Sequence, residues 1–278
     1  MRTLIIFLVI GASSLFARDM VTLDDNFTIR TDQLRVDINI DGAELEVKKG
    51  DSHKDVRVYM RYNALDTEGN IRFNEKRGTM DIMVDTDLWD MDNSGDGNNA
   101  PKVIVELPDR PEIEIEARIK AGEITFELGE LKIADFILKN WAGETKVNFE
   151  QPNRMTMRTF DVNCKVGEIS LLNLGNARFE SGRINAGIGE LTLGFHGDAL
   201  DKCVADIDLD LGETRIILPQ ESGVKIRVSK FLFLNETSMP HWFVQRGDYY
   251  YSENFDDADK SLMLAISSGI GELSVQVE

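Results

Sequence analysis

The stretch VGEISLLNLGNARFESGRINAGIGELTL, residues 166–193, contains Gly-Glu twice, each time followed by alternating apolar and polar residues. The dipeptide recurs along the second half of the chain. Its regularly spaced glycines are Gly122, Gly143, Gly167, Gly189, Gly212 and Gly271. The first four intervals are 21, 24, 22 and 23 residues, and the last is 59. A repeat of this period indicates stacked structural units.

The residues around these glycines repeat as well. Position two after the glycine is Ile, Leu or Thr, positions four and six are apolar with one exception, and position three is always polar. This is the period-two pattern of a strand with one buried face. Positions −5 and −1 are apolar and −4 is polar, so a second alternating strand leads into each glycine. Each unit is therefore predicted to be a strand, a Gly-Glu corner, a strand and a return.

Units of this length without a helical pattern are typical of a β-solenoid. We predict an all-β, single-domain β-solenoid, similar to a parallel β-helix, with coils of about 21–24 residues. Coils stacked about 4.8 Å apart would share one core and pair their backbones. An antiparallel sandwich is the rival, but equivalent columns recur every two strands, which favours the solenoid. Glycine suits the corner because it reaches positive φ without steric cost.

The first residues predict export. Residues 1–17, MRTLIIFLVIGASSLFA, combine Arg2 with an apolar stretch too short to span a bilayer and with small residues that offer cleavage points. We expect a signal peptide that is cleaved after Ser14 or Ala17. The mature chain has no second long apolar segment and hence no expected transmembrane segment. We therefore expect a protein of the periplasm or cell surface of a bacterium.

The remainder is predicted to form one elongated domain. Residues 18–110 contain alternating stretches with degraded spacing, which we expect to be N-terminal strands and a cap of the solenoid. Residues 111–278 carry the repeats, and a cap insertion is expected at about 230–260, inside the interval of 59 residues.

The charge limits the partners. The formal net charge is −18, and removal of residues 1–17 takes away only Arg2 and leaves −19. This balance argues against nucleic acid and against an electrostatic hold on anionic membrane. It fits cationic partners, divalent metal or solubility alone. We expect an envelope protein or glycan as partner, and a monomer or small oligomer.

Several segments carry a family resemblance. KVIVELP (102–108), AGETKVNFEQPN (142–153), LGNARFE (174–180) and IGELTLGFHGD (188–198) resemble the toast-rack family of exported bacterial proteins. LGETRIILPQESGVKIRV and the closing segment from YYYSENF onward extend the resemblance. The family is related to the C-terminal domain of LiaF-type cell-wall-active-antibiotic response proteins. The resemblance implies a β-solenoid in the cell envelope and brings no catalytic residues. The chain lacks the transmembrane helices of the LiaF type, which argues against direct regulation of a membrane kinase.

The corner glutamates are the first candidate site. They are Glu123, Glu144, Glu168, Glu190, Glu213 and Glu272. In stacked coils they would form a column of carboxylates, which Ca²⁺ could bridge. The alternative, which we favour, is that they mark the corner. Each would then accept hydrogen bonds from corner amides or pair with Lys146 or Arg215.

An acidic segment, DLWDMDNSGDGNNAPK (87–102), is the second candidate. Four side chains match the start of a calcium loop: Asp90, Asp92, Ser94 and Asp96. Gly95 stands at the sixth place, but Pro101 occupies the twelfth, where such a loop needs Glu. The alternative is a hairpin connection between two strands. Apart from this Ca²⁺, we expect no cofactor.

A run of acids, ADIDLDLG (205–212), places Asp206, Asp208 and Asp210 on one strand face. Carboxylate clusters of this kind serve acid–base chemistry in carbohydrate-active enzymes on β-helices. The neighbouring coil would place Arg183 beside Asp206 and Asn185 beside Asp208, however. That arrangement is typical of a charged outer face.

An aromatic-rich segment, residues 231–255, interrupts the repeat. Five of its residues are candidate binding residues: Trp242, Phe243, Tyr249, Tyr250 and Tyr251. Exposed aromatic rings can bind sugar or peptide. The alternative is a cap that hides the last coil's edge and core.

The two cysteines are predicted to be free. Cys164 lies three residues before Gly167 on an inward column, and Cys203 lies two coils further along. Two coil spacings are about 9–10 Å, beyond the limit of about 7 Å between the Cα atoms of a disulfide. We expect Cys164 to be buried.

The predicted function is that of a non-enzymatic exported envelope protein acting through its surface, by binding, adhesion or sensing of envelope stress. A self-assembling structural solenoid is the first alternative. A carbohydrate-active enzyme on a β-helix is the second.

Overall fold

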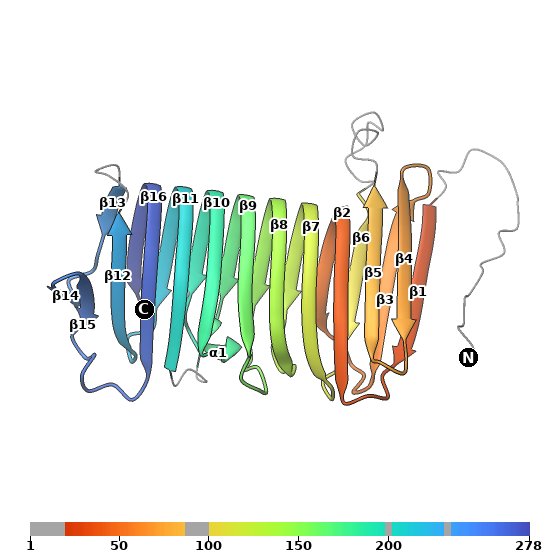
Figure 1. Ribbon diagram of the computed structural model, residues 1–278, viewed down its shortest axis with the longest axis horizontal. Helices are drawn as coiled ribbons and strands as arrows, with labels where there is room; N and C mark the ends of the chain where they lie inside the picture. The colour runs from red at the N-terminus through yellow and green to blue at the C-terminus, as the bar shows by residue number, and fades with distance from the viewer. Residues whose placement is uncertain (1–19, 87–99, 198–201, 231–234) are drawn as a thin grey trace, which may run out of the picture.

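The computed structural model describes residues 20–86, 100–197, 202–230 and 235–278. These residues form a rack of stacked strands, and the long strands bend back on themselves (Figure 1). The predicted signal peptide lies outside the described residues. So do the candidate calcium ligands Asp90, Asp92, Ser94 and Asp96.

Long bent strands build the rack. They are β2 (Gln33–Lys49), β7 (Glu112–Glu127), β8 (Ile133–Asn148), β9 (Thr159–Leu172), β10 (Ser181–Gly194), β11 (Lys202–Leu218) and β16 (Ser261–Val277). Each pairs in parallel with the next in this order. Each has two arms joined by a bend, and each arm alternates buried and exposed side chains. A one-turn helix, α1 (Leu174–Ala177), lies in the return between β9 and β10.

The bends are in exact register, which confirms the solenoid over the sandwich. The six glycines of the repeat are paired in a continuous column, each with a φ between 115° and 146°. In β2 the same position is Ala43, which pairs with Gly122. The prediction of a single-domain, all-β solenoid is therefore correct.

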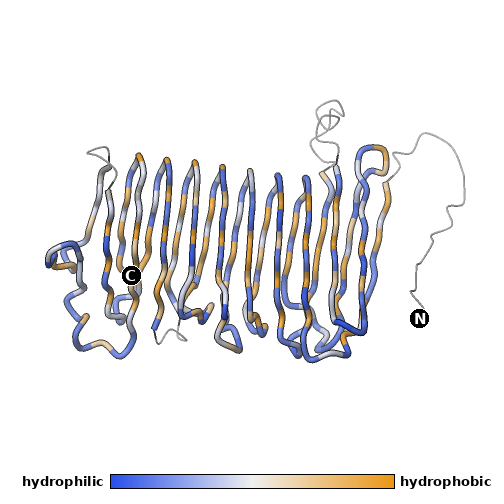
Figure 2. Tube along the Cα trace, viewed as in Figure 1, coloured by the Kyte–Doolittle hydropathy of each residue, from blue (hydrophilic) through white to orange (hydrophobic). Residues whose placement is uncertain are grey.

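The hydrophobic core lies between the two arms of the rack. Figure 2 shows hydrophobic and hydrophilic residues following one another along the strands of both arms. Phenylalanines from successive coils contact one another along the core. Phe136 and Phe160 lie 5.8 Å apart between ring centroids, and Phe160 and Phe179 lie 4.6 Å apart. Phe126, from the second arm of β7, meets Phe136 edge-on at 5.1 Å. Such contacts add to the stability from area burial alone.

The bend itself departs from the predicted alternation. That pattern would place the residue before each glycine on the inner face. Positions −5 and −3 are buried as expected, for example Val162 and Cys164 in β9. The residue at −1, Val166, is instead 50% exposed. The chain turns between positions −3 and 0, so alternation stops before the glycine.

The N-terminal strands complete one end. β5 (Thr79–Thr86) pairs in parallel with the first arm of β2, and β6 (Lys102–Leu107) pairs with its second arm. The expected hairpin between these two strands is wrong, because they are two arms of one coil. Antiparallel strands then close the end: β3 (Asp55–Asn63) on β6, β1 (Met20–Thr28) on β3, and β4 (Thr67–Asn74) on β5.

The C-terminal end is built out of chain order. β12 (Gly223–Lys230) and β13 (Asn235–Ser238) continue the two arms, but they pair with β16 rather than with β11. β16 lies between them and β11. A hairpin of β14 (Phe243–Arg246) and β15 (Tyr249–Ser252) covers the edge of β12. The interval of 59 residues thus holds one further coil and a hairpin.

Candidate binding surfaces

The corner glutamates form a column along one edge of the rack. All six predicted members are exposed and stand in register. The pairing adds Glu44 at one end and Glu236 at the other. Lys146 does not pair with Glu144, because its Nζ lies 2.9 Å from a carboxylate oxygen of Glu127. Within the described ranges, no three potential metal ligands come together.

The acids of β11 lie on the outer face, as the column argument predicts. Arg183 stands beside Asp206, and Asn185 stands beside Asp208. The three aspartates are exposed. Partial burial, followed by the nearby charge of Asp210, raises the pKa of Asp208 above its usual value. A carboxyl with a raised pKa is disfavoured in its charged form.

We therefore expect Asp208→Asn to leave the fold intact and to stabilise it slightly at pH 7. A folded-state pKa above the unfolded one destabilises the folded protein at pH values above both. The gain should be under about 0.5 kcal/mol because solvent screens an exposed group. It should become small at about pH 3 and vanish at lower pH, because the carboxyl is then protonated in both states. Urea unfolding at pH 7 and pH 3 measures this, and a loss of stability at pH 7 would contradict it.

The aromatic candidates divide into two groups. Trp242, Phe243 and Tyr250 are half-buried and pack against the hydrophobic core. Trp242 and Phe243 meet edge-on, with 5.3 Å between ring centroids. This packing gives these three side chains a structural role in covering the last coil.

Tyr249 and Tyr251 point to the other face of β15, since side chains alternate along a strand. Their ring centroids lie 6.2 Å apart, and the Lys225 ammonium lies 4.1 Å from the Tyr249 centroid. The Arg246 guanidinium lies 5.3 Å from Tyr251. A cation therefore lies over one face of each of these two rings. Binding by these five aromatic residues stays a prediction.

Both cysteines are free, as predicted, and Cys164 is buried as expected; Cys203 is buried as well. Cys164 lies on the column of Ala186 and Leu209. Burial raises the pKa of Cys164 to about 11 and that of Cys203 to about 12.

We expect both thiols to resist alkylation in the folded chain at pH 8. The thiolate is the reactive species, and burial keeps each thiol protonated and away from reagent. Mass spectrometry should find unlabelled native chain under conditions that label both thiols in urea. Labelling of the native chain at the urea rate would contradict this expectation.

The candidate list derived from the sequence missed the exposed apolar residues of the bends. Val166, Ile188, Leu211 and Ile270 are each between 42% and 52% exposed. They precede the stacked glycines directly and pair in register. The signal was present, because each Gly-Glu follows an apolar residue. Only the geometry of the bend shows that these side chains face outward.

Comparison with known proteins finds one family model that matches the chain. Residues 18–171 match the family model described as the N-terminal domain of toast_rack, DUF2154. No curated protein shows significant sequence similarity to the chain.

Three solved structures of bacterial proteins are similar to the chain at low identity. One from Clostridium sporogenes is described as a "putative cell adhesion protein". It is 13% identical over 93% of this chain and 100% of that one, with a TM-score of 0.41. A "putative adhesin" from Bacteroides fragilis is 12% identical over 93% and 98%, with a TM-score of 0.34. A "putative lipid binding protein" from Parabacteroides distasonis is 10% identical over 91% and 96%, with a TM-score of 0.32.

Across the described ranges, no helix has the length and apolar character needed to cross a membrane.

Proposed function

The chain belongs to the toast-rack family, whose model matches more than half of it, and from this premise we propose that it is a non-enzymatic binding protein of the bacterial envelope. It acts through the outer surface of its solenoid, in adhesion or in sensing envelope stress. The partner is an envelope protein or a glycan. Export depends on the signal-like residues 1–17.

One observation carries the proposal: the stacked coils repeat the same side chain at the same height. The glutamate column is the clearest case, with equivalent carboxylates one strand spacing apart. A repeated surface offers many equivalent weak contacts. Several of them engaged at once give strong overall binding without a deep pocket. Extended surfaces of this kind are how solenoid proteins commonly bind.

Fractionation and co-sedimentation test the proposal. The full chain is expressed in a bacterium that has a periplasm, and a variant lacking residues 2–17 serves as control. We expect the full chain outside the cytoplasm, cleaved after Ser14 or Ala17, and the control inside. The purified mature chain should then co-sediment with envelope fragments or sacculi. An uncleaved cytoplasmic chain, or a mature chain that stays in the supernatant with every envelope fraction, would overturn the proposal.

End-to-end assembly is disfavoured by the strands at both ends. β1 and β4 close one end with antiparallel strands, and β14 and β15 cover β12 at the other. Edges covered in this way do not offer the parallel register of the coils to another copy. Light scattering of the mature chain across concentrations should therefore show a monomer or small oligomer, whereas filaments would favour the structural alternative.

A carbohydrate-active enzyme is the second candidate, and the raised pKa of Asp208 is the observation that favours it. A general acid needs such a pKa. Asp208 lies on an exposed outer face beside Asn185 and Ser267, however. Turnover of acidic glycans by the native chain, lost in Asp208→Asn, would establish the enzyme. Equal and negligible turnover by both would support the binding protein.

A further inference from the structure

One row of apolar side chains lies outside the hydrophobic core. At the bends of β9, β10, β11 and β16, the side chains of Val166, Ile188, Leu211 and Ile270 stand outward in a row, which we call the apolar ridge. They are 50%, 52%, 42% and 44% exposed. Register pairing keeps them one strand spacing apart, so the ridge spans about 14 Å. Figure 2 shows the bend edge coloured as hydrophobic over these strands.

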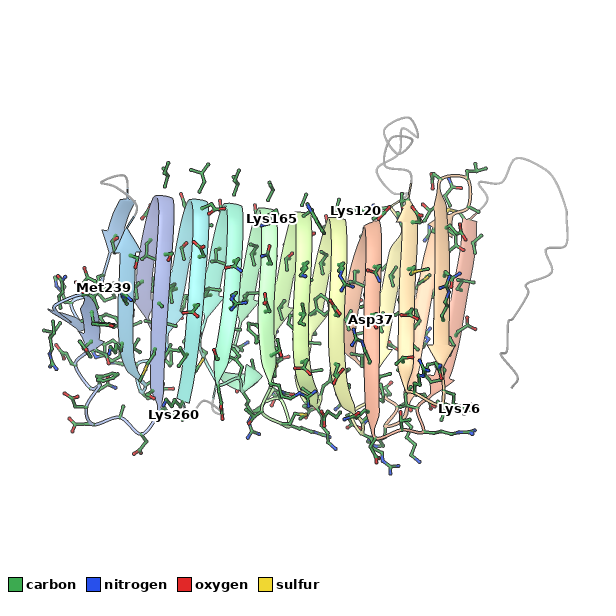
Figure 3. The ribbon with its side chains drawn as sticks, viewed as in Figure 1. Asp37, Lys76, Lys120, Lys165, Met239 and Lys260 are labelled. Atoms are coloured by element: carbon green, nitrogen blue, oxygen red, sulfur yellow. The ribbon has the colours of Figure 1, made fainter. Side chains whose placement is uncertain are left out.

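The ridge is confined to one end of the solenoid. The same bend position is Ala121 in β7 and Ala142 in β8, so the large aliphatic side chains begin only at β9. The position before it is Lys120 in β7, Trp141 (54% exposed) in β8 and Lys165 in β9, beside Val166, and Figure 3 labels both lysines. The position of Lys165 becomes Gly187 in β10 and Asp210 in β11. In β10 and β11, the position beside the ridge residue therefore carries no basic side chain.

Acids flank the ridge on its other side. Glu168, Glu190, Glu213 and Glu272 each follow a ridge residue by two positions, and all four are exposed. None of the four makes an ion pair with another residue of the described ranges. Exposed parallel carboxylates at this spacing repel one another by about 1 kcal/mol in water. A partner that brings positive charge would relieve this repulsion.

We propose that the apolar ridge and its glutamates are a docking site for a cationic amphipathic α-helix of a partner protein. The apolar face of the helix lies on the ridge, and its Lys or Arg side chains reach the glutamate column. This inference rests on the proposed binding function and names the chemistry of the partner.

The spacing supports a helix lying along the edge. An α-helix advances 5.4 Å per turn and the coils advance about 4.8 Å, so successive turns meet successive coils. The mismatch is only about 2 Å over the length of the ridge. Apolar residues at i, i+3, i+4 and i+7 form one face of an amphipathic helix and would contact neighbouring ridge residues.

Charge disfavours the other occupants. A second copy placed ridge to ridge would bring two glutamate columns together in a chain with a net charge of −18. An anionic lipid surface would be repelled by the same column. Only a partner with basic residues beside its apolar face complements both the apolar ridge and the glutamates that flank it.

The test uses a synthetic 18-residue Leu/Lys helix as probe and the mature chain in solution. Two comparison peptides are a scrambled Leu/Lys peptide without an apolar face and a Leu/Glu helix of the same pattern. We expect the amphipathic Leu/Lys helix to bind, and the scrambled and acidic peptides to bind at least about ten-fold more weakly. Fluorescence anisotropy measures each affinity at low and moderate salt. Equal binding of the scrambled peptide would overturn the proposal.

Matched variants locate the site. Ile188→Asn with Leu211→Asn should weaken binding about ten-fold, whereas Ala121→Asn with Ala142→Asn, at the same bend position, should change it less than two-fold. Glu190→Gln with Glu213→Gln should weaken binding and reduce its salt dependence. Urea midpoints confirm that each variant is folded, and Ile188→Ala replaces the double variant if that one is not. Equal effects of the ridge and alanine-position variants would place binding elsewhere and overturn the proposal.

Failure here is distinguishable from failure of the proposed function. A chain that co-sediments with envelope fragments but does not bind the Leu/Lys helix removes only this inference. A chain that does neither removes both.

Discussion

Gly189→Ala is expected to destabilise the folded chain by at least about 4 kcal/mol, among the largest effects of any single substitution. Gly189 has a φ of 143°, and a Cβ placed on it would lie 1.9 Å from the carbonyl oxygen of Gly167 in the preceding coil. That oxygen is backbone held between two paired arms, so it cannot move aside without disturbing both coils. Urea unfolding measures the loss.

Gly247→Ala is the matched control. Gly247 also has a positive φ, 63°, but nothing lies within 4 Å of a Cβ placed there. Its substitution should cost only about 1–2 kcal/mol, the price of the backbone conformation alone. If the two variants lose the same stability, the close approach of stacked bends is not what requires glycine.

Asn153→Ala should be the second large effect, at about 3–5 kcal/mol. Asn153 is fully buried. Its Oδ1 accepts a hydrogen bond from the N–H of Ile133 at 2.9 Å, and its Nδ2 donates to the carbonyls of Ile133 and Met155 at 2.9 and 2.8 Å. A further contact at 3.3 Å reaches the carbonyl of Ala177. Alanine would leave these buried backbone groups without partners.

Asn148→Ala provides the comparison for this variant. The Nδ2 of Asn148 donates to a carboxylate oxygen of Glu127 at 2.7 Å, and its Oδ1 accepts from the Nδ2 of Asn173 at 2.8 Å. The side chain is only half-buried, so water can replace both bonds. Their loss should cost under about 1 kcal/mol. Thermal or urea unfolding of both variants would contradict the argument if Asn148→Ala were the more damaging.

The sequence predicts most of the solenoid because each coil must match its neighbour. A column of glycines at Gly167 and Gly189, with apolar residues at fixed offsets, is visible without coordinates. The pairing of Arg183 with Asp206 followed directly from it. Ala43 shows why the column ends where it does. Ala43 does not have the positive φ of the glycines in the column, so its Cβ is tolerated.

The bend surface and the end of the chain were less predictable. Alternation placed Val166 inside, because a period-two pattern contains no information about where the chain turns. The order of β16 was also hidden: its Gly271 continues the column after Gly212, although β12 precedes it in sequence. Long-range pairing of this kind depends on competition between strands for one edge. The aromatic residues of the insertion predicted a cap on the last coil, but they did not indicate which strand the cap covers.

The position of β16 has a consequence for how an exported chain matures. If translocation delivers the N-terminus first, each coil from β2 to β11 can stack on a coil that has already emerged. β12 and β13 cannot, because both pair with β16, which follows them in the chain. Assembly therefore pauses after β11 until residues 261–277 emerge as β16, which pairs with β11 on one side and with β12 and β13 on the other. Truncation before residue 261 would release two coils rather than one, so only full-length translocation yields a closed and protease-resistant end.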